Sequence, residues 1–189
     1  MRNVIAKWAF VLMAWGGLLA WTPGGQAQVL ASDAELKPGL AVCYMYALVR
    51  HVDEFAEWEQ HSKCNPGPPL EKLDSRAGVG KVLTSNSDDG VLARITGFIH
   101  LDKAGSYAFS FESNDGVRLK IDGELVLEDP DVHGDQYSDI GRVEVTEPGW
   151  HPIAIDYFER KNTSTLRFFW GPPGTEGTFP LVPAEVLAH

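Results

Sequence analysis

The chain has 189 residues, of which 16 are Lys or Arg and 26 are Asp or Glu, so its formal net charge is −10. An acidic chain lacks the basic face with which nucleic-acid binders neutralise phosphates, so we expect no nucleic-acid partner. Hydrophobic residues make up 44% and charged residues 22% of the sequence, a balance typical of a globular protein and not of a disordered one.

The first 27 residues have the pattern of a secretory signal peptide. Arg2 and Lys7 give a basic start, the stretch 8–21 is uncharged, and Gly25-Gln26-Ala27 supplies small residues for cleavage. The uncharged stretch is shorter than the roughly 20 residues of a membrane-spanning helix. We therefore expect export to the periplasm or the cell exterior; the alternative is an uncleaved membrane anchor.

Cleavage would leave an N-terminal extension over residues 28–38 and a single domain over 39–189, with no stable membrane anchor. The only cysteines, Cys43 and Cys64, are most simply one disulfide in an oxidising compartment. Closing that loop would stabilise the fold by about 3 kcal/mol. A catalytic thiol would need a reduced cysteine beside a base, and zinc would need four ligands, so we expect neither.

Before residue 90, apolar and polar residues alternate less regularly than in the rest of the chain. Residues 39–48 predict an opening strand, and Val52, Phe55 and Ala56 have the spacing of a short helical turn inside the disulfide loop. Pro66-Gly67-Pro68-Pro69 predicts an irregular segment.

From residue 91 onward, apolar and polar residues alternate with a period of two, which predicts strands with one buried and one exposed face. Turn sequences separate the runs, and Asp122-Gly123 predicts a tight hairpin. The runs centre on Ile95, Phe109, Leu119, Val126, Val143, Ile155 and Phe168. Short strands at this spacing indicate an all-β protein, an antiparallel β-sandwich or barrel.

An ordered set of blocks in this region resembles the protective-antigen-type (PA14) domain family. The blocks are GSYAFSFESNDGVRLKIDG at 105–123, His133-Gly134, PGWHPI at 148–153, Asp156-Tyr157-Phe158, Trp170-Gly171-Pro172 and PAEVL at 183–187. The resemblance covers nearly all of residues 39–189. It implies a β-sandwich of the kind found in toxins, adhesins and glycosidases, where it commonly binds carbohydrate.

The resemblance also implies a metal site. In sugar-binding members, two adjacent acidic residues joined by a cis peptide hold calcium, the calcium holds sugar hydroxyls, and a later loop adds an Asn or Gln ligand. The matching pair here is Asn114-Asp115, and Asn162 is the candidate for the later ligand. Asn114 offers an oxygen without a charge, and Arg160 and Lys161 repel a cation, so we expect weak calcium binding or a lost site.

Other interpretations of these segments stay open. Asn114-Asp115-Gly116 has the composition of a hairpin turn, and so has Asp88-Asp89-Gly90. The acidic segment 129–134 has the start of a calcium loop but lacks the bidentate Glu, which predicts a solvated loop.

Aromatic side chains are a second source of binding residues. Tyr137 and Trp58 lie in irregular segments and are candidates for stacking on a sugar ring, whereas Trp150 and Trp170 lie in strand patterns and predict core positions.

We therefore expect an exported, lectin-like carbohydrate-binding module with a calcium cofactor and a glycan or cell-surface polysaccharide as its partner. The alternative is a structural or protein-interaction domain that binds envelope proteins without a metal. The sequence contains neither Gly-x-Ser-x-Gly nor His-Glu-x-x-His, so we expect no enzyme activity.

Overall fold

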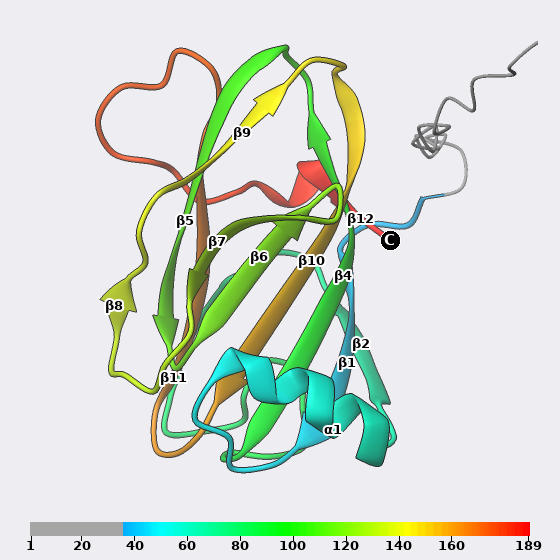
Figure 1. Cartoon of the computed structure of the whole chain (residues 1–189), viewed down its shortest axis with the longest axis vertical. Helices are drawn as coiled ribbons and strands as arrows, with labels where there is room; N and C mark the ends of the chain where they lie inside the picture. Colours follow the sequence, from blue (N-terminus) through cyan, green and yellow to red (C-terminus); the bar gives the residue numbers. More distant parts are fainter. Residues whose placement is uncertain (1–35) are drawn as a thin grey trace, which may run out of the picture.

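The computed structural model describes residues 36–189. The signal peptide expected over residues 1–27 and most of the extension over 28–38 lie outside the described residues. Two antiparallel sheets pack face to face, and a short helix covers part of one outer face (Figure 1). The expected all-β sandwich is confirmed.

The larger sheet has the strand order β2–β1–β4–β10–β6–β7, and β12 also pairs with β4. Its strands are β2 (Asn65–Leu70), β1 (Leu40–Tyr46), β4 (Val91–Leu101), β10 (Gly149–Glu159), β6 (Val117–Ile121), β7 (Glu124–Asp129) and β12 (Leu187–Ala188). The predicted hairpin joins β6 to β7, where Asp122 and Gly123 both have positive φ, as a two-residue hairpin requires.

The smaller sheet has the order β3–β11–β5–β8, and β9 also pairs with β5. Its strands are β3 (Asp74–Gly78), β11 (Ser164–Gly171), β5 (Gly105–Asn114), β8 (Gln136–Tyr137) and β9 (Gly141–Val145). Alternate residues of β5 and β11 point between the sheets, where Phe109, Phe111 and Phe168 stack with no exposed surface. Truncating one such ring to alanine typically costs about 3–5 kcal/mol.

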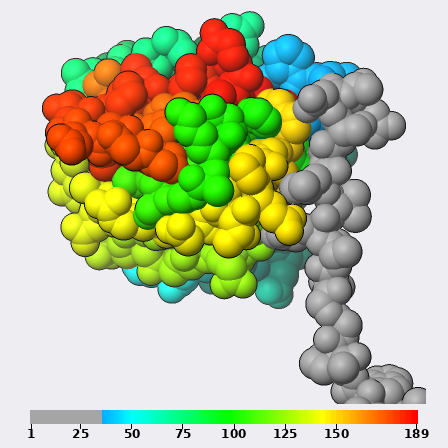
Figure 2. All heavy atoms as spheres, turned by 90° about the horizontal axis from the view of Figure 1, so that it is seen from above, coloured from blue at the N-terminus to red at the C-terminus, as the bar shows by residue number. Residues whose placement is uncertain are grey.

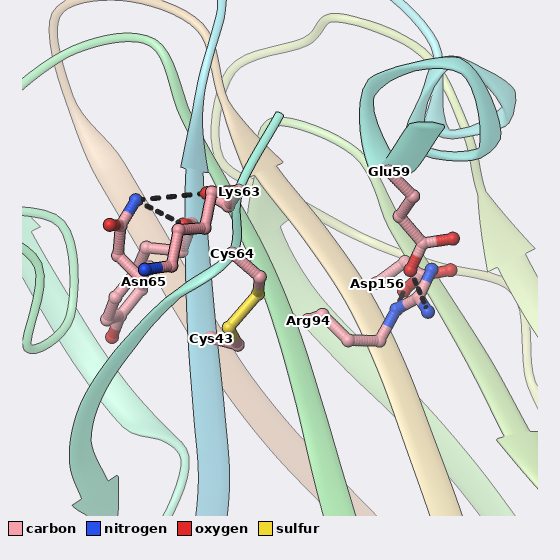
Figure 3. The surroundings of a disulfide bond; sticks show 8 residues. Cys43, Glu59, Lys63, Cys64, Asn65, Arg94 and Asp156 are labelled. Atoms are coloured by element: carbon pink, nitrogen blue, oxygen red, sulfur yellow. Dashed lines mark hydrogen bonds and ion pairs between the residues drawn. A yellow bond between two sulfur atoms is a disulfide. The ribbon is translucent and has the colours of Figure 1, made fainter. Parts of the chain in front are cut away.

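The predicted disulfide is confirmed: Cys43 on β1 is bonded to Cys64, which directly precedes β2 (Figure 3). The loop that it closes contains the 3-10 turn η1 (Val52–Glu54) and the helix α1 (Phe55–His61), so the expected helical turn is also confirmed. Phe55 packs against Met45, Leu92 and Phe158 on the outer face of the larger sheet.

Two strands before residue 90 differ from what the sequence predicts. The proline-rich segment expected to be irregular is the strand β2. Prolines cannot donate to a sheet, but β2 lies at an edge, where half of the backbone groups need no strand partner. The other edge strand, β3, has no fully buried residue and therefore no apolar alternation to reveal it.

Lys37, near the start of the described residues, lies beside His189 at the other end of the chain. Lys37 and His189 exchange two backbone hydrogen bonds of 2.8 Å, and Leu187 of β12 pairs with Ile99 near the far end of β4. Figure 2 looks onto this end, where the β4–β5 turn (green), the β9–β10 turn (yellow) and the segment after β11 (orange to red) meet. The short 3-10 turn η2 (Ala184–Val186) leads into β12.

None of the helices within residues 36–189 is long and apolar enough to span a membrane.

Candidate functional site

The segment Asn114-Asp115-Gly116 carries the chain from one sheet to the other. Asn114 ends β5 in the smaller sheet and Val117 begins β6 in the larger one, so the interpretation as a hairpin turn is wrong. The peptide bond between Asn114 and Asp115 is cis, as in the family arrangement. A Cβ at Gly116 would lie 2.5 Å from the Phe158 ring and 2.8 Å from the Pro130 carbonyl oxygen, so only glycine fits this crossing.

Asp115 is almost completely buried, with 3% of its surface exposed. Its Oδ1 accepts the backbone N–H of His133 at 3.0 Å, and its Oδ2 accepts the backbone N–H of Arg160 at 2.7 Å. Burial raises the pKa of this carboxyl, and the two N–H donors partly offset that effect. One carboxylate therefore joins the loop after β7 to the loop after β10.

The Asn114 side chain joins the same two loops. Its Nδ2 donates to Asp135 Oδ1 at 3.2 Å and to Thr163 Oγ1 at 2.9 Å, and its backbone carbonyl accepts the Tyr157 hydroxyl at 2.6 Å. Because both amide hydrogens have acceptors, Asn114 Oδ1 is the atom of this side chain left to act as an acceptor. The loop over residues 131–135 therefore bonds to the pair, although none of its residues is buried, so its expected character as a solvated loop is confirmed.

Asn162 lies in the exposed β10–β11 loop at the same end of the sandwich. Its φ of 81° is left-handed, which Asn tolerates better than most residues. Its backbone N–H donates to Asp89 Oδ1 at 2.7 Å. The structure thus brings Asn114, Asp115 and Asn162 to one end of the sandwich and adds Asp89, which sequence reasoning assigned to an unrelated turn.

Sequence reasoning also missed Glu159, the last residue of β10. Its side chain has no exposed surface, and neither carboxylate oxygen has a hydrogen-bond partner. Burial, and then the charges of Asp89 and Asp115, raise its pKa to about 7. The period-two pattern of β10 could have revealed it, because Glu159 is in phase with the buried Ile155 and Tyr157.

The two candidate aromatic residues lie on different sheets of the sandwich. Tyr137 on β8 is 64% exposed, lies opposite Glu112 of β5 and tilts against the Phe169 ring at a centroid distance of 5.8 Å. Trp58 packs against the Phe55 cluster on the outer face of the larger sheet.

Of the two tryptophans expected in the core, only one is buried. Trp170 is buried as predicted, but Trp150 is only half-buried, and its ring tilts against His100 at 4.9 Å. Trp150 fails the prediction because it is out of phase with the buried residues of β10, which run from His151 through Ile153 and Ile155 in steps of two.

The chemistry of these side chains fits calcium, which binds six to eight oxygens from carboxylates, amides, carbonyls and water. Asn114 Oδ1, Asp115 and Asn162 supply the family's donor types, and Glu159 adds a buried carboxylate without a partner. Within residues 36–189, no three His, Cys, Asp or Glu side chains group closely enough to form a metal site. Calcium here would therefore depend on amide oxygens, backbone carbonyls and water as well as carboxylates.

The model of the PA14 domain family matches residues 81–180. The chain belongs to the PA14 domain family. Solved structures share the same fold at low sequence identity. The PA14 domain of the antifreeze protein MpAFP is 16% identical with a TM-score of 0.67, and the match covers 86% of this chain and 96% of that one.

Two adhesin domains also match. For the PA14 sugar-binding domain from an RTX adhesin, the identity is 19% and the TM-score 0.64, over 80% of this chain and 98% of that one. The epithelial adhesin 9 A domain from Candida glabrata, in complex with Galβ1-4GlcNAc, is 12% identical with a TM-score of 0.58. That match covers 78% of this chain and 88% of the adhesin domain.

A longer protein contains a similar fold. This chain spans about half (47%) of an anti-sigma factor domain-containing protein, with 79% of this chain covered, 18% identity and a TM-score of 0.65. By sequence, no characterised protein matches.

Proposed function

We propose that the chain is a carbohydrate-binding module whose glycan-binding end carries Asn114, Asp115 and Asn162. One observation carries the proposal: Asn114 and Asp115, both buried, each bond to the loops on either side of the crossing between the sheets. Such a crossing holds polar side chains and loops in a fixed arrangement, as a site for small polar ligands requires. The sugar-binding adhesin domain and the adhesin–Galβ1-4GlcNAc complex, which share this fold, support the choice of glycan.

Calcium is part of this proposal. Asn114 Oδ1, the Asp115 carboxylate and the Asn162 amide would hold it. When bound, the ion would supply a positive charge that coordinates paired sugar hydroxyls. The protein's own part is to position the Asp115 carboxylate through the His133 and Arg160 N–H groups, and the Asn114 amide through Asp135 and Thr163. With one carboxylate in the pair instead of two, we expect weak affinity, in the millimolar class of extracellular calcium modules.

We further propose that the module is exported and binds a glycan or cell-surface polysaccharide outside the cytoplasm, as a binding protein and not an enzyme. The Cys43–Cys64 disulfide supports export, because such bonds persist in oxidising compartments.

Calcium titration tests the metal. Calcium should raise the melting temperature of the protein, because a ligand bound only by the native state stabilises it. Asp115→Ala should abolish the shift. Asn162→Gly keeps the left-handed backbone but removes the amide, so it should reduce the shift without lowering the melting temperature in chelator. Asn162→Ala is the matched control for backbone strain, since it should lower that temperature as well.

A glycan array, run with calcium and with chelator, tests the carbohydrate. Binding that is lost in chelator and in Asp115→Ala would support the proposal, and no binding under either condition would contradict it.

A second function rests on the same contacts. The Asp115 carboxylate already has two protein N–H donors, so it can fix the two loops without a metal. A structural or protein-interaction domain of the cell envelope would need no more than that. This second function predicts that millimolar calcium does not shift the melting temperature and that no glycan binds. It also predicts a lower melting temperature for Asp115→Ala.

A further inference from the structure

A hollow lies beside the proposed glycan-binding end. It is lined by Tyr46, Asn65, Asn86 and Ser87 and has a volume of about 430 Å³. That volume is within the range of small-molecule sites. Tyr46 and Asn65 lie outside residues 81–180, the part of the chain that matches the PA14 family, so the hollow forms where the family domain meets the disulfide-bonded segment.

We propose that this hollow binds a neutral sugar unit and is a second subsite for the glycan of the proposed function, on which the inference rests. The lining is one aromatic ring, two amides and a hydroxyl, without a charged side chain. A tyrosine ring can stack on the apolar face of a sugar, and amides can pair with its hydroxyls. The nearby Lys81 ammonium already donates to the Asn86 backbone carbonyl at 3.0 Å, and no charged side chain lines the hollow itself.

The polar atoms of the hollow are available to a ligand. Asn65 uses its Nδ2 to donate to the carbonyls of Tyr44 and Lys63, both at 3.2 Å, which leaves its Oδ1 as an acceptor (Figure 3). Among residues 36–189, neither the Tyr46 hydroxyl nor the Asn86 amide has a hydrogen-bond partner. The Tyr46 side chain is 42% exposed, so a ligand can reach its ring.

Two of the four lining residues, Asn65 and Ser87, are also fixed before any ligand arrives. Asn65 directly follows the disulfide at Cys64 and pairs with Tyr44 across β1 and β2. Ser87 donates its backbone N–H to Ser85 Oγ at 3.2 Å and its hydroxyl to the Asp89 carbonyl at 2.8 Å. A ligand would therefore bind without first ordering these groups, which preserves affinity.

The hollow and the Asn114–Asp115 site lie close enough to hold one oligosaccharide. Tyr46 pairs with Val91 of β4, and Val91 pairs with Glu159 of β10, so Tyr46 and Glu159 occupy one row of the sheet. Two strand spacings separate them by about 10 Å. Asp89, two residues beyond Ser87, bonds to Asn162 of the first site. An oligosaccharide of a few units can span that separation.

Binding of an array of neutral and anionic oligosaccharides, from two to six units long, tests the inference with the full protein in calcium. Tyr46→Ala and Asn86→Ala are the subsite variants, chosen because their side chains hold no part of the fold. Asp115→Ala is the first-site variant, and Leu125→Ala, an exposed apolar residue on β7, is the control for loss of surface area.

We expect the subsite variants to bind the longer neutral oligosaccharides about tenfold more weakly, the loss typical of a removed aromatic or hydrogen-bonding contact. Their affinity for disaccharides and their thermal shift with calcium should stay at the wild-type level. If wild type and both subsite variants bind the longer glycans equally, and only Asp115→Ala loses that binding, the subsite is overturned and the proposed function stands. Wild-type protein that binds no oligosaccharide on the array would overturn both.

Discussion

The backbone N–H of Asn162 donates a 2.7 Å hydrogen bond to Asp89 Oδ1, although 73 residues separate the two in the chain. β4 and β10 are neighbouring strands, so the loop that precedes β4 and the loop that follows β10 meet at the same end of the sheet. Asp89 therefore helps to hold the loop that carries the third candidate ligand.

Asp89→Ala should loosen that loop. A hydrogen bond to a carboxylate contributes about 1.5–3 kcal/mol when well formed, and less at an exposed site such as this one. We expect faster hydrogen exchange at the Asn162 amide and a smaller thermal shift with calcium. Asp89→Asn, which keeps an acceptor oxygen, should exchange nearly as slowly as wild type, and equal exchange rates in all three proteins would contradict the role.

Glu159→Gln should change how stability depends on pH. The pKa of Glu159 is about 7 in the folded protein, against the ordinary glutamate value of 4.5, so between these values the folded protein keeps a proton that the unfolded chain has released. Its contribution to stability is therefore greatest below pH 4.5 and is lost as the pH rises through about 7.

The measurement is the melting temperature in chelator across that pH range. Wild type should lose stability relative to Glu159→Gln as the pH rises, and the variant should melt higher at about pH 8. Parallel pH profiles for the two proteins would show that Glu159 titrates normally.

Asn114→Asp should strengthen calcium binding but weaken the protein without calcium. A second carboxylate in the pair adds a negative charge next to the ion. The same change removes the Nδ2 donor and sets two carboxylates, residues 114 and 135, against each other where the hydrogen bond is now 3.2 Å. Isothermal titration with calcium and melting in chelator measure the two effects; a variant that is equally stable in chelator would contradict the role of the amide.

Replacing both cysteines, Cys43→Ser with Cys64→Ser, should lower the free energy of unfolding by about 3 kcal/mol, since the bond closes a loop across a sequence separation of 21. Urea unfolding of wild type, with and without reductant, provides the matched comparison. The reduced wild type and the double variant should unfold at the same urea concentration, and an unchanged midpoint in both would rule out a stabilising bond.

The strands from residue 91 onward were predictable because apolar and polar side chains alternate along them, as in β6, where Val117, Leu119 and Ile121 are buried and the residues between them are not. The edge strands were not, because β2 is rich in proline and β3 is exposed. Turn composition could not tell a hairpin from a crossing between sheets at Asn114-Asp115-Gly116, since both use the same residues.

The candidate site was predictable only where the family resemblance supplied it. Asn114 and Asp115 came from a motif, but the Asp115 partners His133 and Arg160, and the Asn162 partner Asp89, lie in loops distant in the chain, with no local pattern to link them. Glu159 is the exception, because the alternation along β10 places it inward with Tyr157.

The hydrogen-bonded pairing of Lys37 with His189 has a practical consequence. It lies beside β12, whose Leu187 pairs with Ile99, about 26 Å along β4 from Val91 at the end that carries Asp89 and Asn162. A tether attached after His189 would leave that end facing away from its support. Immobilisation through the C-terminus on a sensor chip or bead should therefore present the proposed glycan surface unobstructed, whereas coupling through random lysines would include Lys161 and block it.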